Sequence, residues 1–361
     1  GSKAHIARLS QEGYQLLREN YLSDAERLFR EILEHDTENN YALVGLGDSA
    51  RKRGDCREAV KHYRRCLEHH PRNNYALFGL ADCYKNMRQF HRAIEVWEQY
   101  LEHDDENVTV LTRVADAHRK VRNFDRSKEL YDRVLSIEEN NAYAIIGLAH
   151  LHYDFKDYES ALYYWNWMLR ISGPRVDIRV LTSIGNCYRK LKRFETAEEF
   201  FNRALEREPN NFYALFGLGD CYRGLGEPET ALEYWNRILA RDPKNKVILT
   251  RAGDAYRSIG KPDTAQQYYE QALNIEFDAY AVLGLALLNM DAGDYTRAIE
   301  SLEALVQSAP KNARVYETLA ECYLKAGRRR DAVTLLQSFP QQGKRNRRIT
   351  DILERIRGDR D

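Results

Sequence analysis

The feature that most constrains this chain is a repeat of about 34 residues. The segment that begins Tyr41-Ala42-Leu43 returns as Tyr75-Ala76-Leu77, and the same spacing continues with small slips from about Ile6 to Phe339. Such an array grows along one axis and needs no single central core. We count ten units and number the positions in each from its first residue; the units start near Ile6, Asn40, Asn74, Val108, Ala142, Ile178, Phe212, Lys246, Ala279 and Ala313.

Small and large residues alternate at fixed positions within the units. Position 8 is always Gly or Ala, and position 20 is always Ala or Ser. Two antiparallel helices pack at about 8–10 Å only where small side chains let the backbones meet. Position 24 is usually aromatic, as in Tyr63, Trp97 and Phe201, and fills the space between units. The pattern predicts a hairpin of helices A and B in every unit.

Helix ends are marked by Gly and Pro. We predict that helix A stops at a left-handed glycine where the unit offers one, and that helix B stops before proline. The glycines are Gly54, Gly226, Gly260, Gly293 and Gly327, and the prolines are Pro71, Pro209, Pro243 and Pro310.

This pattern resembles the tetratricopeptide repeat family. The unit with Leu215, Leu218, Gly219 and Tyr222 in helix A, then Ala231, Trp235 and Pro243, follows the family signature. The resemblance implies an all-α, right-handed superhelical solenoid of about ten helix-turn-helix units, whose A helices line a concave groove that binds peptides or extended protein segments. We divide the chain into an N-terminal unit (1–39), two repeat blocks (40–177 and 178–343) and a C-terminal basic capping helix (344–361).

The predicted capping helix, from Lys344 to Arg357, is amphipathic. Ile349, Ile352, Leu353 and Ile356 form one apolar face, and the other face is basic. Terminal repeats need a polar outer cap, so capping explains the pattern; a basic patch for an acidic partner or for membrane headgroups is the alternative. The joint from Ser172 to Asp177 carries two extra residues and offers a slight hinge.

A longer duplication underlies the short repeat. Residues 74–211 resemble residues 212–345: Tyr75-Ala76-Leu77-Phe78 returns as Tyr213-Ala214-Leu215-Phe216. The matches fall at positions 2, 5, 6, 9 and 12, which in the resembled family face the groove. The same set of residues at groove positions therefore occurs twice in the chain.

The groove positions carry tyrosine, acid and base. Position 2 is often Tyr, position 9 is often Asp, and position 12 is mostly Arg. Position 6 is Arg in two units, at Arg113 and Arg251. Each Asp can pair with the base one turn on, so these side chains form either a ladder between A helices or a set of ligand contacts; the two are compatible. The candidate binding residues are Tyr75, Phe78, Asp82, Arg113, Asp116, Arg119, Tyr143, Ile146, His150, Tyr213, Phe216, Asp220, Arg223, Arg251, Asp254, Arg257, Tyr280, Leu283 and Leu287.

Two units replace these charges with apolar groups. The unit from Ala142 offers Ile146, His150 and Tyr153, and the unit from Ala279 offers Leu283, Leu287 and Met290. We expect the two patches to face each other across the lumen and to grip apolar side chains. Extra packing against a neighbouring loop is the alternative.

Several function classes lack support in the sequence. The 55 basic and 55 acidic residues cancel, whereas a general nucleic-acid binder needs excess Lys and Arg. We find no P-loop, esterase or metalloprotease motif, and His150 and His152 cannot chelate one metal because residues two apart on a helix point to different sides. No Lys occupies position 5, where the resembled family's chaperone-tail binders carry one. We therefore expect no catalysis, no cofactor and no metal.

The sequence thus predicts a monomeric scaffold that binds a partner protein or peptide. Six cysteines without a pairing pattern favour a reducing compartment, so we expect a cytoplasmic protein. Gly1-Ser2 resembles a cloning remnant, which leaves a periplasmic or membrane-anchored origin open. The alternatives are a targeting or regulatory module of a larger protein, and a carrier of an apolar small ligand.

Overall fold

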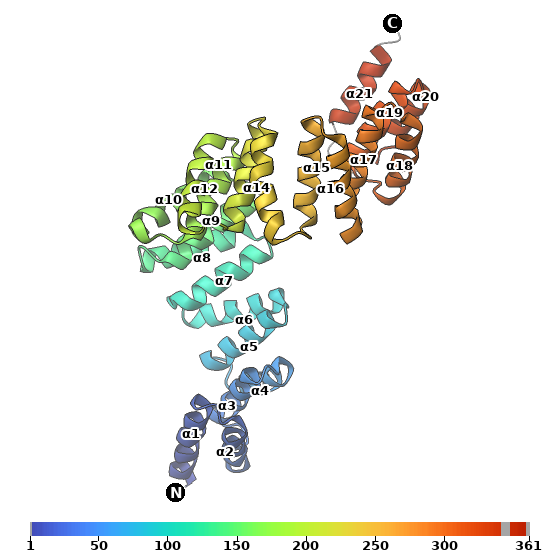
Figure 1. Ribbon diagram of the computed structural model, residues 1–361. Helices are drawn as coiled ribbons and strands as arrows, with labels where there is room; N and C mark the ends of the chain where they lie inside the picture. The colour runs from blue at the N-terminus through green and yellow to red at the C-terminus, as the bar shows by residue number, and fades with distance from the viewer. Residues whose placement is uncertain (1, 341–346, 359–361) are drawn as a thin grey trace. The chain divides into compact units, whose positions relative to one another are not determined.

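A computed structural model describes residues 2–340 and 347–358, and within these residues it contains helices and no strand (Figure 1). The helices form successive antiparallel hairpins, as predicted for an α-helical solenoid. The chain divides into two compact units, residues 1–176 and 177–361. Each unit is described by itself. Among the described residues, no helix is both long and apolar enough to cross a membrane.

The first unit contains five hairpins. Its A helices are α1 (Ser2–Arg18), α3 (Asn40–Lys52), α5 (Asn74–Asn86), α7 (Val108–Lys120) and α9 (Ala142–Asp154). Its B helices are α2 (Leu22–His35), α4 (Cys56–His69), α6 (Phe90–His103), α8 (Phe124–Ile137) and α10 (Tyr158–Ser172). A short 3-10 turn, η1 (Gly173–Arg175), follows α10.

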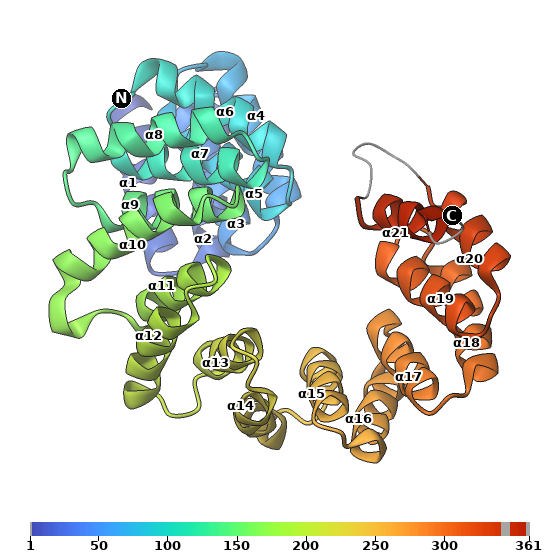
Figure 2. The ribbon, with the colours of Figure 1, turned by 90° about the horizontal axis from the view of Figure 1, so that it is seen from above.

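The second unit contains five more hairpins and a final helix. Its A helices are α11 (Ile178–Lys190), α13 (Phe212–Gly224), α15 (Lys246–Ser258), α17 (Ala279–Asp291) and α19 (Ala313–Lys325). Its B helices are α12 (Phe194–Arg207), α14 (Pro228–Arg241), α16 (Pro262–Ile275), α18 (Tyr295–Ser308) and α20 (Arg329–Gln337), and α21 (Arg347–Gly358) comes last. Figure 2 shows α13, α15 and α17 on the inner side of this unit's arc, with α14, α16 and α18 outside.

Every A helix after the first begins at the residue that the repeat predicted. The residue before each start is Asn or Asp, and its side chain accepts a backbone N–H of the first turn, as Asn39 does from Ala42 at 3.0 Å. Such a cap satisfies one of the donors that a helix start leaves unpaired. Only α1 begins earlier than predicted, at Ser2 instead of Ile6.

The turn between helices A and B contains one left-handed residue. The five predicted glycines have φ between 74° and 83°. The other units make the same turn with Asn20, Arg88, Arg122, Lys156 and Lys192, at φ of 60° to 66°. The sequence did not predict left-handed backbone at these five residues, because L side chains with a Cβ adopt it only at a cost of about 1–2 kcal/mol.

The aromatic ring at position 24 joins one hairpin to the next. The ring of Phe201 is fully buried between Gly185 of its own hairpin and Gly217 of the following one. A Cβ at Gly217 would lie 2.3 Å from the ring. The rings of Tyr63 and Tyr269 are packed in the same way, each between two glycines. In these hairpins, glycine at positions 6 and 8 makes room for the ring as well as for close helix approach.

Tryptophan at position 24 produces a different joint. After Tyr63 and Phe201, the neighbouring A helices meet closely, α3 with α5 and α11 with α13. After Trp97 and Trp235, the next A helix carries arginine at position 6 in place of glycine, and the backbones of α5 and α7, and of α13 and α15, stay apart. The larger indole holds these helices away from each other, and the arginine side chain fills the gap.

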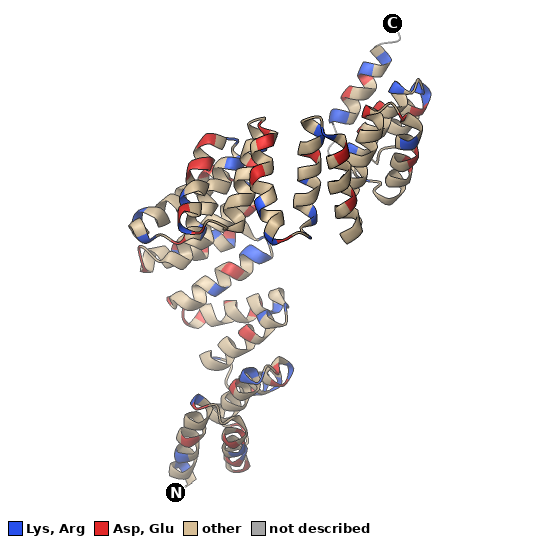
Figure 3. Cartoon of the chain, in the orientation of Figure 1, with Lys and Arg blue, Asp and Glu red and all other residues tan. Residues whose placement is uncertain are grey.

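The C-terminal helix α21 packs against the second unit. Ile349 and Ile356 of α21 are buried and join the core formed by α17 to α20. Arg347, Arg355 and Arg357 are exposed, in keeping with the polar outer face. Residues 344–346 of the predicted helix lie outside the described residues. Acidic and basic residues are interspersed along both units (Figure 3). All six cysteines are free.

The packed rings predict a steric penalty. We expect Gly217→Ala to destabilise the protein by about 1–3 kcal/mol, because the buried ring of Phe201 has no room to move away. Chemical denaturation followed by circular dichroism measures this. Gly358→Ala is the control, since a Cβ there meets nothing within 4 Å; equal midpoints for the two variants would contradict the packing argument.

The left-handed turns predict a stabilising change. Lys192 is exposed with φ of 61°, so Lys192→Gly should stabilise the protein by about 0.5–1 kcal/mol by relieving backbone strain. Gly226→Ala, at the equivalent turn, should have the opposite sign. Thermal melts of both variants test this, and a lower melting temperature for Lys192→Gly would refute it.

Candidate functional site

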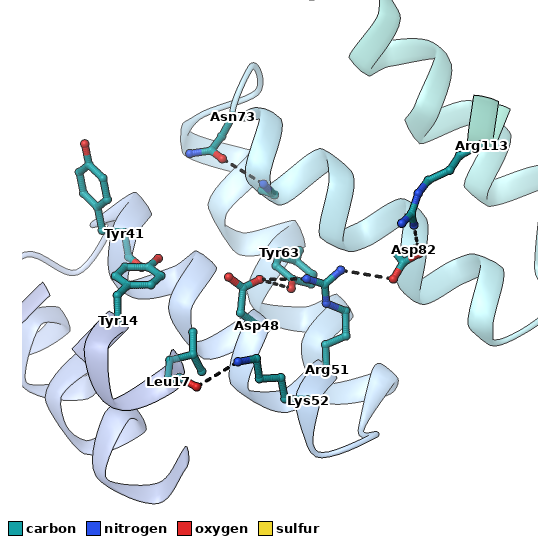
Figure 4. Close-up of polar contacts among 11 residues, drawn as sticks. Tyr14, Leu17, Tyr41, Asp48, Arg51, Lys52, Tyr63, Asn73, Asp82 and Arg113 are labelled. Atoms are coloured by element: carbon teal, nitrogen blue, oxygen red, sulfur yellow. Dashed lines mark hydrogen bonds and ion pairs between the residues drawn. The ribbon is translucent and has the colours of Figure 1, made fainter. Parts of the chain in front are cut away.

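The A helices of the first unit present a polar cluster centred on Asp82 of α5 (Figure 4). One Asp82 oxygen accepts from Arg113 Nη1 of α7 at 2.7 Å, and the other accepts from Arg51 Nη1 of α3 at 3.3 Å. Arg51 also lies 3.7 Å from Asp48 on its own helix. The predicted pairing within one helix therefore exists, but the shorter bonds run between helices and tie three hairpins together.

Arg113 also stacks on an aromatic pair. Its guanidinium lies 4.7 Å from the ring centre of Phe78, and Phe78 contacts Trp97 edge to face at 5.0 Å. Cation–π contacts of this kind add to the ion pair with Asp82. Arg113 therefore stands where other units have the position-6 glycine, because Trp97 leaves no close contact between the helices. The gap between α5 and α7 is filled by charged and aromatic groups.

Three other aspartates at position 9 are held by tyrosine hydroxyls. Asp48 accepts from Tyr63 at 2.5 Å, and Asp116 and Asp254 accept from Tyr131 and Tyr269. Burial raises the pKa of Asp48, although the Tyr63 hydroxyl and Arg51 oppose the rise. The hydrogen-bond partner of the aspartate at position 9 therefore depends on the residue at position 24. Where position 24 is tyrosine, its hydroxyl donates to the aspartate. Where it is tryptophan, the aspartate accepts from arginine instead.

The second unit repeats the cluster 138 residues later in the sequence. Asp220 of α13 accepts from Arg251 Nη1 at 2.6 and 2.7 Å and from Arg189 Nη1 at 3.4 Å, and Arg223 lies 3.6 Å away. Arg251 lies 4.6 Å from the ring centre of Phe216. The Asp220 side chain is only 2% exposed. The duplication seen in the sequence is therefore also a duplication of side-chain contacts.

Arg119 and Arg257, two further predicted charges, form one ion pair in each unit. Arg119 contacts Asp154 at 3.4 Å, and Arg257 contacts Asp291 at 2.8 Å. His150 lies edge-on to Trp165 at 5.1 Å, and desolvation together with the Arg119 cation lowers its pKa. The imidazole is therefore neutral at pH 7. It contributes no charge to the surface that the A helices form, which we call the wall.

Three adjoining hollows run along the A helices at the start of the first unit. The first, of about 650 Å³, is lined by Tyr14 and Tyr41; the second, of about 430 Å³, shares both tyrosines and adds Tyr75. The third, of about 460 Å³, shares Tyr75 and Asp48 with the second and adds Phe78. We call these three hollows the tyrosine groove. Tyr41 is 60% exposed and Tyr75 is 79% exposed.

Some residues of this groove were absent from the predicted set. Tyr14 donates its hydroxyl to the carbonyl oxygen of Tyr41 at 2.6 Å (Figure 4), and its place at position 9 of the first unit was a usable signal. Asn74 and Tyr100 line the third hollow. Tyr100 belongs to the end of a B helix, a region from which the sequence predicted no groove residue.

The other predicted residues differ in their exposure. Tyr143, Tyr213 and Tyr280 are 76%, 62% and 53% exposed, so their rings are available for contact. Ile146 and Leu287 are half-buried. Leu283 is only 2% exposed and packs in the core of α17 to α20, so the expectation that it lines a groove is wrong: its hairpin needs an apolar residue there. That the two apolar patches face each other stays a prediction.

Comparison with known families identifies the chain. Models described as tetratricopeptide repeat match residues 44–86, 75–106, 178–211, 211–275, 250–313 and 289–356, which together cover more than half of the sequence. The chain is a tetratricopeptide repeat protein. Among curated proteins, none matches its sequence.

The comparison with solved structures gives matches over part of the chain. MamA is 21% identical with a TM-score of 0.45, over 48% of this chain and 94% of MamA. A tetratricopeptide repeat protein from Parabacteroides merdae is 17% identical with a TM-score of 0.42, over 79% and 98%. YrrB, described as having an unusual peptide-binding site, is 21% identical with a TM-score of 0.43, over 52% and 97%.

The described part of this tetratricopeptide repeat protein holds no cluster of three metal-ligating side chains. Its acidic groups on the A helices are instead engaged by tyrosine hydroxyls and guanidinium groups. The wall is thus built from bonds that fix side-chain positions, with exposed tyrosines between them.

The two aspartate clusters predict unequal stability effects. Asp220→Asn should destabilise the protein by about 3 kcal/mol, because it leaves three guanidinium groups around a buried site without a counter-charge. Asp82→Asn should cost about 1 kcal/mol, since the Asp82 side chain is 19% exposed and contacts two arginines. Urea denaturation of both variants tests the order, and a larger loss for Asp82→Asn would overturn it.

Proposed function

We propose that this tetratricopeptide repeat protein is a scaffold that binds an extended segment of a partner protein along its A helices. The observation that carries the proposal is the tyrosine groove, three adjoining hollows flanked by the exposed rings of Tyr41 and Tyr75. Large exposed aromatic side chains beside connected hollows are typical of binding surfaces.

The chemistry of the groove suits a peptide. A tyrosine ring gives much contact area with few rotatable bonds, and its hydroxyl can hydrogen-bond to a main chain. Asp48 and Arg51 line the third hollow beside Phe78, so acceptor, donor and apolar surface lie next to one another. Each hollow has a volume in the range of about 300–1,000 Å³ that is usual for ligand sites.

The ion-pair ladder supports binding by holding groove side chains in place. Arg51 is fixed between Asp48 at 3.7 Å and Asp82 at 3.3 Å, so its side chain has little freedom left to lose. A ligand that contacts a pre-positioned arginine loses less entropy on binding than one that must order it. The ladder and the binding surface are therefore two roles of the same residues.

The burial of the second apolar patch favours a peptide over an apolar small ligand. Leu283 and Met290 are 2% and 6% exposed, so little apolar surface remains there for a carrier function. The acids at position 9 already accept bonds from tyrosine or arginine, which supports binding more than catalysis.

The proposal predicts that tyrosine truncation weakens peptide binding. Dodecapeptides selected for binding from a random display library would be labelled with fluorescein and titrated by fluorescence anisotropy. We expect Tyr41→Ala/Tyr75→Ala to raise Kd by about 30-fold, because tyrosine anchors at interfaces contribute about 2 kcal/mol or more.

Tyr21→Ala is the matched control. Tyr21 is 57% exposed, like Tyr41, but it precedes α2 and lines none of the three hollows. Its replacement should leave Kd unchanged. Selected peptides that bind the double variant as tightly as the unchanged protein would reject the tyrosine groove as the binding site.

A further inference from the structure

Three arginines converge on one buried carboxylate in the second unit. Arg189 of α11, Arg223 of α13 and Arg251 of α15 lie 3.4, 3.6 and 2.6 Å from Asp220 oxygens. Asp254 also acts on Arg223, and with two carboxylates against three arginines the cluster keeps a surplus of positive charge. Since these helices lie on the A-helix side of the unit, that surplus belongs to the same wall as the exposed ring of Tyr213.

The cluster also has more donors than its carboxylate can use. Each guanidinium has five N–H donors, whereas one carboxylate offers about four acceptor positions. The Arg189 Nε is buried without a hydrogen-bond partner, and the Arg223 side chain is 52% exposed. The exposed Arg223 side chain therefore keeps donors that a further acceptor can reach from solvent.

The first unit provides an internal comparison. Its equivalent cations are Arg51, Lys85 and Arg113, but there Arg51 contacts a second carboxylate, Asp48, at 3.7 Å. In the second unit the residue equivalent to Asp48 is Asn186. The change accompanies Tyr63 becoming Phe201, which removes the hydroxyl that Asp48 accepts from. One negative charge is thus lost from the second cluster, while all three cations are kept.

Charge crowding also contributes to the lowered pKa of Arg251. Burial lowers the pKa of Arg251, and the neighbouring Arg223 and Arg189 cations lower it further, against the opposing effect of Asp220. The guanidinium stays charged in water at any ordinary pH. An additional anion would relieve this repulsion.

We propose that Arg189, Arg223 and Arg251 form a site for a carboxylate, supplied by a glutamate or aspartate side chain of the bound segment. Guanidinium groups match carboxylates with paired hydrogen bonds, and a single negative charge reduces the surplus without reversing it. Phe216 and Trp235 form its apolar border, 4.6 Å from Arg251 and 5.9 Å from Arg223. This inference rests on the proposed function for the ligand class, an acidic peptide.

The test follows the arginine side chains directly. Guanidinium Nε–Hε signals of the full chain would be recorded by NMR during titration with acetyl-Gly-Glu-Glu-Gly-amide, with acetyl-Gly-Gln-Gln-Gly-amide, and with inorganic phosphate. We expect the glutamate peptide to shift the signals of all three arginines along one saturable curve. The glutamine peptide should leave them in place.

Two variants test the charge argument. Asn186→Asp restores the carboxylate found in the first unit and should weaken binding of the glutamate peptide at least about fivefold, because it competes for Arg189. Asp48→Asn is the matched change in the first unit and should make the Arg51 and Arg113 signals respond to the same peptide. Should Asn186→Asp not fold, Arg223→Gln changes the most exposed of the three arginines and should abolish the response.

The remaining outcomes each overturn the inference. Absent shifts, or equal shifts with the glutamine peptide, would exclude a carboxylate site. A response to phosphate alone would assign the cluster to a phosphate group. An unchanged affinity in Asn186→Asp would refute the role of charge surplus. Tyr41→Ala/Tyr75→Ala should not alter this titration, so a failure here with intact tyrosine-dependent peptide binding would leave the proposed function standing.

Discussion

The structure depends on the contact of one aromatic ring with two helices. At position 24 the ring of a B helix is buried against position 8 of its own hairpin and position 6 of the next. Ring and glycine are complementary, because a Cβ on either side would lie well inside the van der Waals radius of the ring atoms. Each hairpin buries its ring only when the following hairpin is present, which is the physical basis of stacking in repeat proteins.

The size of that ring also decides the chemistry of the A-helix wall. Phenylalanine and tyrosine allow glycine at position 6 and close helix approach, and tyrosine adds a hydroxyl that an aspartate accepts from. Tryptophan keeps the next A helix at a distance, and arginine then crosses the gap to an aspartate. Packing and charge are therefore linked. Where tryptophan at position 24 keeps two A helices apart, the arginine at position 6 of the second helix lies between them.

The duplicated pattern carries different surfaces in the two units. Both units keep the Arg–Asp–Arg bridge over a Phe–Trp pair. The first unit adds a second carboxylate and a row of tyrosines beside linked hollows. The second loses that carboxylate and buries its aspartate more deeply, 2% against 19% exposed. A tyrosine-rich surface and a cation-rich surface thus occur on the same duplicated pattern.

The sequence by itself determined the hairpins, their starting residues and the residues that share the wall. These follow from local rules: asparagine caps, left-handed glycines and small residues at fixed positions act within one or two turns of helix. Only the tertiary structure decided which partner each wall residue bonds. Asp82 and Arg113 are 31 residues apart in sequence, Leu283 is drawn into the core, and Arg122 adopts left-handed backbone without glycine. Such outcomes depend on the distance between neighbouring hairpins, which the buried ring sets and which no single unit contains.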